Sequence, residues 1–297
     1  MPTSHLAREI ASQPDTWAAA VELAGGTPRL PARGARVAVI GCGTSWFMAQ
    51  SYARLRETSG QGATDAFTAT EAALDRDYDA VIAITRSGTT TEVLELLDEV
   101  RGRIPTIGIV GDTGSPLVDL VDTVIGLPFA DERSVVQTRF ATSALTYLRA
   151  STGQDLTSAI DEARGLLDWE PDDGLLEAEQ FSFLGTGWTI GLAHEAALKM
   201  REAAQLWTES YPAMEYRHGP ISIAAPGRVT WILGAVPERL QHDIEATGAR
   251  FEHGDRDPLA DLIRTQKLAL ARALALGLDP DQPRNLTRSV VLDDHEA

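Results

Sequence analysis

The sequence has 297 residues, of which 43% are hydrophobic and 23% are charged, and its formal net charge is −17 at pH 7. A chain of this composition can bury two cores of ordinary domain size, whereas its negative charge opposes binding to nucleic acid and to anionic membranes. It contains no apolar stretch of 18 residues, its first ten residues show no apolar segment of the kind that a secretory leader needs, and its single cysteine is Cys42. We therefore expect a cytoplasmic protein without disulfides, metal or cofactor.

Short β-rich runs alternate with helical patterns in the first half of the chain. Strands are expected at residues 36–40, 79–85, 105–110 and 122–127, with helices from about Ser45 and at residues 91–100. Strands separated by helix-length segments indicate right-handed βαβ units in a mainly parallel, doubly wound sheet.

The alternation stops at a helix-prone stretch, residues 155–168, and at residues 169–174, whose proline and glycine mark the expected linker. It then restarts, with expected strands at 181–185 and 229–236 and expected helices at 189–207, from Pro237 and at 258–276. Residues 39–45 and 183–188 both lead from an expected strand through glycine and threonine residues into an expected helix, which is typical of a degenerate tandem duplication. The sequence predicts an α/β fold with two doubly wound parallel-sheet domains in tandem, at residues 1–170 with an N-terminal helix and 171–297 with a C-terminal tail.

A loop rich in hydroxyl groups, residues 87–90, follows an apolar strand and precedes a helix. Its free backbone N–H groups, its hydroxyls and the positive end of the helix dipole together suit an anion. The alternative is that Thr90 is only an N-cap and Ser87-Gly88 only a tight turn. Arg86 either adds a bidentate grip on a phosphate or is an exposed turn residue.

One face of the predicted helix at residues 189–207 places two carboxylates and an ammonium group in line between two leucines. These residues are Leu192, Glu195, Lys199, Glu202 and Leu206. Their alignment indicates a lined cleft, and the alternative is a solvated i,i+4 ion pair. His218 lies in a rigid His-Gly-Pro turn, where it is either an acid or base near neutral pH or an ordinary surface histidine.

Taken together, these motifs resemble the SIS-domain (sugar isomerase) phosphosugar enzymes, above all the isomerase half of glucosamine-6-phosphate synthase. The resemblance covers nearly the whole chain. Its motifs are residues 8–14, 41–45, 87–90, 195–202, 218–220 and 281–286.

The resemblance implies that the protein is an enzyme whose substrate is a sugar 6-phosphate. The implied phosphate-binding residues are Ser45, Thr85, Arg86, Ser87 and Thr90, of which Thr85 and Arg86 stand where the family usually has Ser and Gln. The implied catalytic residues are Glu202 as the base at C1/C2, Lys199 and Glu195 as its companions, and His218 for ring opening. Because that histidine comes from a neighbouring subunit in the family, a homodimer with a shared active site is also implied.

Three departures from the family bear on activity. Residue 2 is proline rather than a nucleophilic cysteine and no glutaminase half is expected, so glutamine cannot supply ammonia. Arg288 replaces the lysine of the family's tail and cannot form a Schiff base. Gln137 replaces a small hydroxyl residue and, with Val135, is expected to line the sugar site.

The resulting hypothesis is an enzyme of aminosugar metabolism that takes the C2 proton of a hexose or aminohexose 6-phosphate, which leads to isomerisation or deamination. If C2 carries an N-acetyl group, loss of the 3-hydroxyl would make the protein a lyase, a dehydratase. A non-catalytic sugar-phosphate sensor is the alternative from another class, although such a sensor does not need the four catalytic side chains together.

Overall fold

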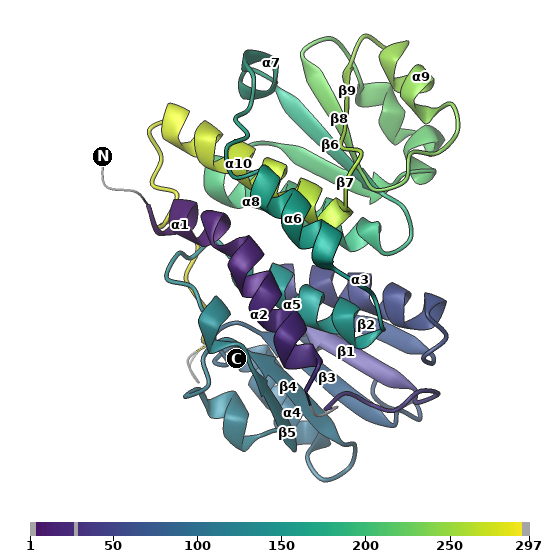
Figure 1. Ribbon diagram of the computed structural model, residues 1–297, viewed down its shortest axis with the longest axis vertical. Coiled ribbons are helices and arrows are strands. Elements are labelled where there is room, and N and C mark those ends of the chain that lie inside the picture. The colour runs from purple at the N-terminus through teal and green to yellow at the C-terminus, as the bar shows by residue number, and fades with distance from the viewer. Residues whose placement is uncertain (1–3, 27–28, 293–297) are drawn as a thin grey trace. The chain divides into compact units, whose positions relative to one another are not determined.

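The computed structural model describes residues 4–26 and 29–292, which form two compact units (Figure 1). Within that part of the chain, the four-stranded unit consists of residues 4–14 and 157–284, and the five-stranded unit consists of residues 15–156 and 285–292. Each terminal segment thus packs in the unit built mainly from the other half of the chain. The packing crosses the boundary expected at residues 170–171, and the assignment of two domains to 1–170 and 171–297 stays a prediction.

The five-stranded sheet is parallel and has the strand order β2-β1-β3-β4-β5. Its strands are β1 (Val37–Gly41), β2 (Thr64–Thr68), β3 (Ala80–Thr85), β4 (Thr106–Val110) and β5 (Thr123–Gly126). Its helices are α2 (Gln13–Ala24), α3 (Thr44–Thr58), η1 (Ala69–Glu71), α4 (Thr91–Val100), η2 (Pro116–Asp119), η3 (Pro128–Ala130) and α5 (Arg139–Ser151). Strands β1, β3 and β4 are buried along their whole length, as expected for a parallel sheet covered on both faces. Residues Ile40, Val81 and Leu97 belong to the core between the sheet and α4.

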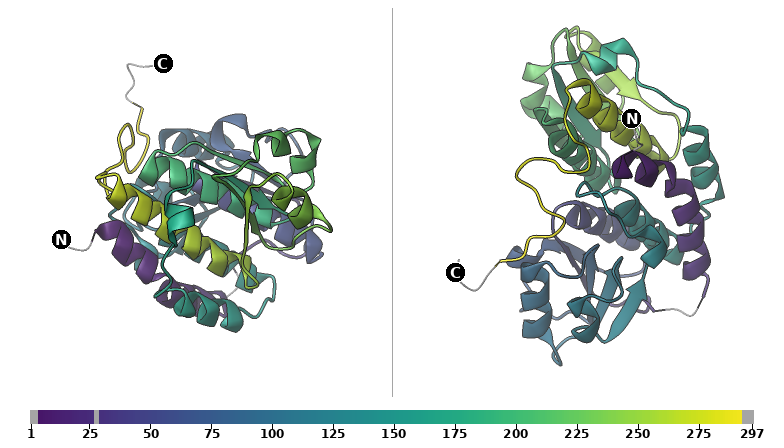
Figure 2. Two further views of the ribbon diagram at one scale, coloured as in Figure 1. Left: turned by 90° about the horizontal axis from the view of Figure 1, so that it is seen from above. Right: turned by 90° about the vertical axis from the view of Figure 1, so that its left-hand side faces the viewer.

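The four-stranded sheet is also parallel and has the order β7-β6-β8-β9. Its strands are β6 (Gln180–Gly185), β7 (Thr208–Pro212), β8 (Arg228–Leu233) and β9 (Arg250–His253). Its helices are α1 (His5–Ala11), α6 (Thr157–Gly165), α7 (Asp173–Leu176), α8 (Thr189–Ala204), η4 (Glu215–His218), η5 (Pro220–Ile223), α9 (Leu240–Glu245) and α10 (Pro258–Ala275). Helix α8 packs on β6 and β7 and lies beside α10, which also contacts α1 and α6 (Figures 1 and 2).

The two units share a topology. The order β2-β1-β3-β4 of the first sheet is repeated as β7-β6-β8-β9 in the second, so the predicted α/β fold with two doubly wound parallel sheets is confirmed. In both units a glycine ends the first strand. A Cβ atom on Gly41 would lie 2.7 Å from the backbone of Ser45, and one on Gly185 would lie 2.2 Å from the backbone of Thr189. Only glycine lets the strand turn so directly into the next helix.

The elements that the sequence analysis missed are mainly the edge strands β2, β7 and β9. Each is only partly buried, because an edge strand has one neighbour, and none shows a continuous apolar run. Helix α5 was also missed. Helix α8 ends at Ala204 rather than at residue 207, because Gln205 adopts a left-handed backbone conformation (φ 55°) that stops the helix.

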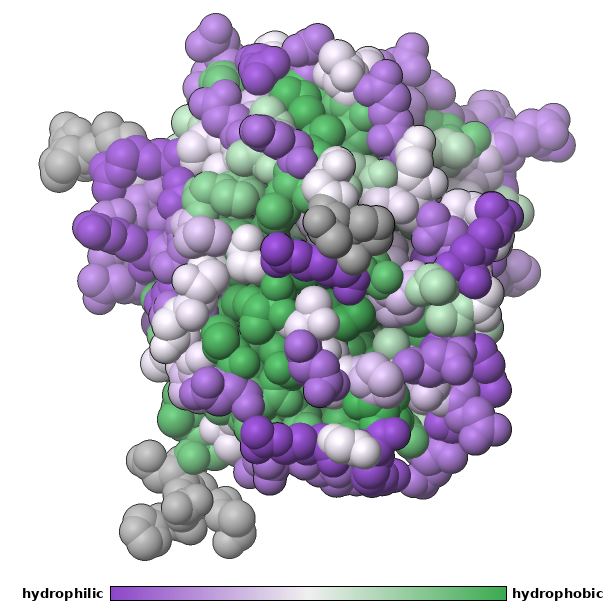
Figure 3. All heavy atoms as spheres, turned by 60° about the horizontal axis from the view of Figure 1, so that its bottom comes forward, coloured by the Kyte–Doolittle hydropathy of each residue, from purple (hydrophilic) through white to green (hydrophobic). Residues whose placement is uncertain are grey.

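The surface mixes hydrophilic and apolar side chains. On the face shown in Figure 3, hydrophilic residues surround smaller apolar areas. In the part of the chain that the structure describes, no helix is long and apolar enough to cross a membrane. The cytoplasmic location expected from the sequence stays a prediction.

Asp281 attaches the C-terminal part of the four-stranded unit to its N-terminal helix. Its carboxylate accepts hydrogen bonds from the N–H groups of His5 and Leu6, both at 2.7 Å, and Ser4 accepts one from Ala7. Three amides of the first turn of α1, which have no partners inside the helix, are therefore satisfied. A carboxylate at this position also interacts favourably with the helix dipole.

We expect Asp281→Ala to lower the free energy of unfolding by about 1–2 kcal/mol, because two amides of α1 lose their acceptor. The measurement is urea denaturation, with the exposed Asp255→Ala as the matched control. Equal stability of the two variants would show that Asp281 does not hold α1.

Candidate active site

The predicted phosphate loop joins β3 to α4. Thr85, Arg86 and Ser87 are each 4% exposed, and Gly88 follows with φ +62°. A Cβ atom on Gly88 would lie 1.9 Å from Oγ of Ser115, so both the backbone conformation and the space require glycine there. The loop is a buried, tightly specified turn at the carboxyl end of its strand.

Hydroxyl groups of this loop bind its own backbone. The N–H of Gly88 donates to Oγ1 of Thr85, and the N–H of Thr89 donates to Oγ of Ser87, both at 3.2 Å. Thr90 precedes the first residue of α4, but its side chain makes no capping hydrogen bond. Thr90 therefore occupies the N-cap position, as the alternative expected, but its hydroxyl does not cap the helix and lies 3.3 Å from Oγ of Ser289. A contact between Thr90 and a phosphate stays a prediction.

Ser45 lies in the first turn of α3 and is 4% exposed. Strands β1 and β3 are parallel neighbours, so α3 and α4 begin at the same edge of the sheet. This arrangement brings Ser45 to the edge that carries Ser87 and Thr90. Ligands of doubly wound folds bind at this edge.

Arg86 is buried and points away from solvent, so the alternative of an exposed turn residue is wrong. Its guanidinium group donates to the carbonyl oxygens of Ser134 (2.9 Å), Val135 (3.1 Å) and Arg288 (2.7 Å). It also lies 3.8 Å from the carboxylate of Glu132. The structure thus shows Arg86 joining three segments of the chain, while its contact with a phosphate stays a prediction.

Gln137 and Arg288 lie in two of these segments. Oε1 of Gln137 is buried and has no hydrogen-bond partner among the described residues, which leaves an acceptor available. Arg288 pairs with Asp131 at 2.5 Å and donates to the carbonyl oxygen of Glu132 at 3.1 Å. The side chain of Arg288 therefore anchors the C-terminal tail to the rest of the five-stranded unit.

The predicted acid/base residues form a triad on α8 in the four-stranded unit. The ammonium group of Lys199 lies 3.5 Å from Glu195 and forms a short hydrogen bond with Glu202. Glu195 and Lys199 are 1% exposed, whereas Glu202 is 18% exposed. The alternative of a solvated ion pair is wrong, and of the three side chains Glu202 is the one accessible to a ligand.

The sequence contains only two lysines, Lys199 and Lys267, against 26 lysines and arginines in total. One of these two lysines, Lys199, is buried between two carboxylates. A charged side chain is buried in a protein mainly when a group of opposite charge lies beside it. Here the carboxylates of Glu195 and Glu202 pair with the ammonium group of Lys199.

His218 ends the short helix η4 and is exposed. Gly219 follows with φ +130°, which fixes the turn before Pro220. Among the residues that the structure describes, no hydrogen bond or ion pair links His218 to the triad. Its role in ring opening stays a prediction.

Two further groups near these elements have shifted pKa values. Burial raises the pKa of the Cys42 thiol, a hydrogen bond from the backbone of Ala69 lowers it, and the charge of Glu92 adds to the rise. Burial, and then the charge of Arg201, lower the pKa of His194. Cys42 is thus a protonated thiol near neutral pH and His194 a neutral imidazole, and neither has the properties of a reactive nucleophile or a cation.

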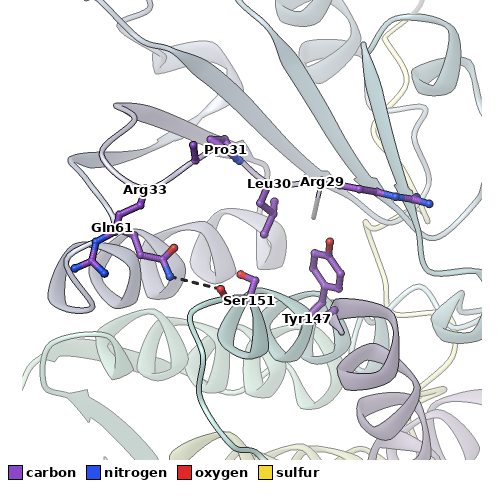
Figure 4. Close-up of a pocket in the computed structure, with 9 residues that line it drawn as sticks. Arg29, Leu30, Pro31, Arg33, Gln61, Tyr147 and Ser151 are labelled. Atoms are coloured by element: carbon purple, nitrogen blue, oxygen red, sulfur yellow. Dashed lines mark hydrogen bonds between the residues drawn. The ribbon is translucent and has the colours of Figure 1, made fainter. Parts of the chain in front are cut away.

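A cavity of about 310 Å³ lies in the five-stranded unit (Figure 4). Tyr147, Gln61 and Ser151 contribute its polar groups, and the side chains of Arg29 and Arg33 point away from its centre. The lining residues from Ala24 to Arg33 precede β1 and Gln61 precedes β2, whereas Tyr147 and Ser151 lie in the last turns of α5. The cavity thus lies at the amino edge of the sheet, opposite the candidate phosphate loop. Within the described residues, no group of three or more His, Cys, Asp or Glu side chains could hold a metal ion.

We expect Lys199→Met to lower the free energy of unfolding by about 3–5 kcal/mol, because it removes the ammonium group that neutralises a buried carboxylate. The double variant Glu195→Gln/Lys199→Met should recover much of this loss. Urea denaturation measures both, with the less buried Lys267→Met as the matched control. A single variant as stable as this control would contradict a buried, charged triad.

Residues 32–151 match the family described as SIS domain. The chain is 27% identical to the isomerizing glutamine–fructose-6-phosphate aminotransferase of Pyrobaculum aerophilum, over 86% of this chain and 51% of that protein. It is 28% identical to the protein of the same name from Thermus thermophilus, over 87% and 52%. The chain therefore spans about half the length of the curated relatives it matches.

Solved structures extend the similarity. A glucosamine-6-phosphate deaminase from Thermotoga maritima has a TM-score of 0.82 at 27% identity and covers 97% of this chain and 100% of its own. The C-terminal domain of the glucosamine-fructose-6-phosphate aminotransferase from Francisella tularensis has a TM-score of 0.80 at 21% identity, over 94% and 98%, which shows the fold alone. The chain thus contains an SIS domain at residues 32–151, resembles the isomerase half of the aminotransferases, and has the two-unit fold of phosphosugar isomerases and deaminases.

Proposed function

We propose that the protein is an enzyme that deaminates glucosamine 6-phosphate, or a closely related aminohexose 6-phosphate, by moving the proton at C2. The observation that carries this proposal is the triad of Glu195, Lys199 and Glu202, in which one accessible carboxylate is backed by two buried charges. The similarity to a protein named as a glucosamine-6-phosphate deaminase, over almost the whole chain, supports the same reaction.

The phosphate is assigned to the loop between β3 and α4. With a net charge of −17, the protein cannot attract an anion through its overall field, so the phosphate needs local donors. The hydroxyls of Ser45, Ser87 and Thr90 and the N-terminus of α4 supply such donors at one edge of the sheet. The phosphate then serves as the fixed end of the substrate.

The chemistry is assigned to α8. After ring opening, the carboxylate of Glu202 takes the C2 proton and returns it to C1. O1 gains a proton and the amine loses one, so the 2-amino aldose becomes the 2-imine of a ketose. Water then adds to C2, ammonia leaves, and a ketose 6-phosphate remains, so atoms and charge balance. Lys199 is too buried to approach the sugar before Glu202, and we assign it the role of holding that carboxylate in position.

The same proton transfer on a sugar without the amine would interconvert an aldose and a ketose.

We further propose that the enzyme is a homodimer in which His218 of one subunit serves the active site of the other. The exposure of His218 and the lack of any described contact with its own triad support a role in another chain. The rigid turn at Gly219 and Pro220 would keep the imidazole in one orientation while it moves the ring-opening proton.

Glu202→Gln should reduce deamination of glucosamine 6-phosphate by about 10²–10⁴-fold, because the C2 proton loses its acceptor. The reaction is followed by NMR in deuterated water, which reports exchange at C2 and C1 together with new products. The exposed Glu177→Gln serves as the matched control. Parallel reactions with fructose 6-phosphate and N-acetylglucosamine 6-phosphate separate isomerase and lyase activities from deaminase activity, and unimpaired exchange by Glu202→Gln would contradict the proposal.

A mixture of two inactive variants should regain activity if the site is shared. Equal co-expression of Glu202→Gln and His218→Asn gives half heterodimers, each with one intact site, so about a quarter of wild-type activity is expected. Each variant alone provides the control, and light scattering gives the oligomeric state. Full activity in a monomer, or no recovery in a proven dimer, would disprove the shared site.

A further inference from the structure

The C-terminal tail, residues 285–292, lies on the candidate phosphate loop and is visible as the yellow segment after α10 (Figure 2). The hydroxyl of Ser87 donates to Oγ of Ser289 at 3.1 Å, and Oγ1 of Thr90 lies 3.3 Å from the same atom. The N–H of Thr91, the first residue of α4, donates to the carbonyl oxygen of Val290 at 3.2 Å. The tail therefore contacts the groups assigned to the phosphate.

We propose that this tail is a displaceable strap, in which the Ser289 hydroxyl and the Val290 carbonyl occupy the positions of two phosphate oxygens. The inference rests on the proposed function, because it takes the loop to be a phosphate site. Under it, the tail and a phosphate compete for the loop, and the position of the tail sets the affinity for the substrate.

The contacts of the strap are those that an anion would make. Phosphate oxygens accept hydrogen bonds from hydroxyls and from N–H groups at the start of a helix. Here Oγ of Ser289 accepts from Ser87, and the oxygen of Val290 accepts from the first amide of α4. Two neutral oxygens thus stand in for a charged group, and a dianionic phosphate would form stronger, charge-assisted hydrogen bonds with the same donors.

Few strong interactions hold the strap on the loop. Four of its side chains are exposed large hydrophobics, so docking removes little apolar surface from water. They are Leu286, Val290, Val291 and Leu292. The ion pair between Arg288 and Asp131 is about one-third exposed, and such pairs contribute little. By contrast, Arg86 is buried and binds the carbonyl oxygen of Arg288, which places the anchor at Arg288 and the displaceable part at residues 289–292.

The test measures binding of inorganic phosphate and of glucosamine 6-phosphate to the full chain by titration calorimetry. Ser289→Ala should tighten both by about two- to tenfold, because the strap loses its bonds to the loop and the open state becomes more populated. The exposed Val291→Ala is the control in the same tail and should bind like the wild type. Ser87→Ala/Thr90→Ala should weaken binding of both ligands in any background.

Hydrogen exchange gives a second readout. The N–H of Leu292 donates to Oγ1 of Thr91 at 2.9 Å in the docked tail, so added phosphate should speed its exchange. Weaker phosphate binding by Ser289→Ala would mean that Ser289 is a ligand and would overturn the strap, as would unchanged exchange at Leu292. If Ser87→Ala/Thr90→Ala weakens phosphate binding but Ser289→Ala leaves the affinity unchanged, the strap is disproved and the phosphate site is kept. If neither the wild type nor any variant binds phosphate, both the strap and the proposed phosphate site are disproved.

Discussion

The parallel pairing of β1 and β3 is the interaction on which the candidate phosphate site depends. Parallel strands bring their carboxyl ends to one edge of a sheet, so the loops after β1 and β3 and the N-termini of α3 and α4 meet there. The same pairing recurs between β6 and β8, which places the start of α8 at the corresponding edge of the four-stranded sheet. Gly41 and Gly185 allow this geometry because any side chain would collide with the helix that follows.

Burial explains how a strongly acidic chain can keep charged groups at defined positions. Lys199 is placed between two carboxylates inside the four-stranded unit, and Arg86 is placed among carbonyl oxygens and Glu132 inside the five-stranded unit. A buried charge requires fixed partners, and those partners fix the charge in return. The accessible carboxylate of Glu202 is consequently presented by a rigid neighbour rather than by a mobile surface side chain.

Arg86 and Arg288 connect separate segments of the five-stranded unit. Both Arg86 and Arg288 use their planar guanidinium groups to bind several oxygens at once, which a glutamine or a lysine cannot do in the same way. Their bonds join the loop after β3, the segment from Asp131 to Val135, and the tail. The two arginines thus couple the tail to the loop after β3, which gives the proposed strap its anchor.

The sequence by itself determined the two parallel-sheet units, the hydroxyl-rich turn after β3 and the face of α8 that carries Glu195, Lys199 and Glu202, because glycine positions, buried strands and helical spacing are local signals. It missed β2, β7 and β9, since edge strands are half-buried and lack a continuous apolar run. Only the tertiary structure decided that Arg86 is buried, that the Thr90 hydroxyl does not cap α4, and that Ser289 contacts the loop. Those contacts join residues about 200 positions apart, such as Ser87 and Ser289, and no local pattern encodes a partner at that distance.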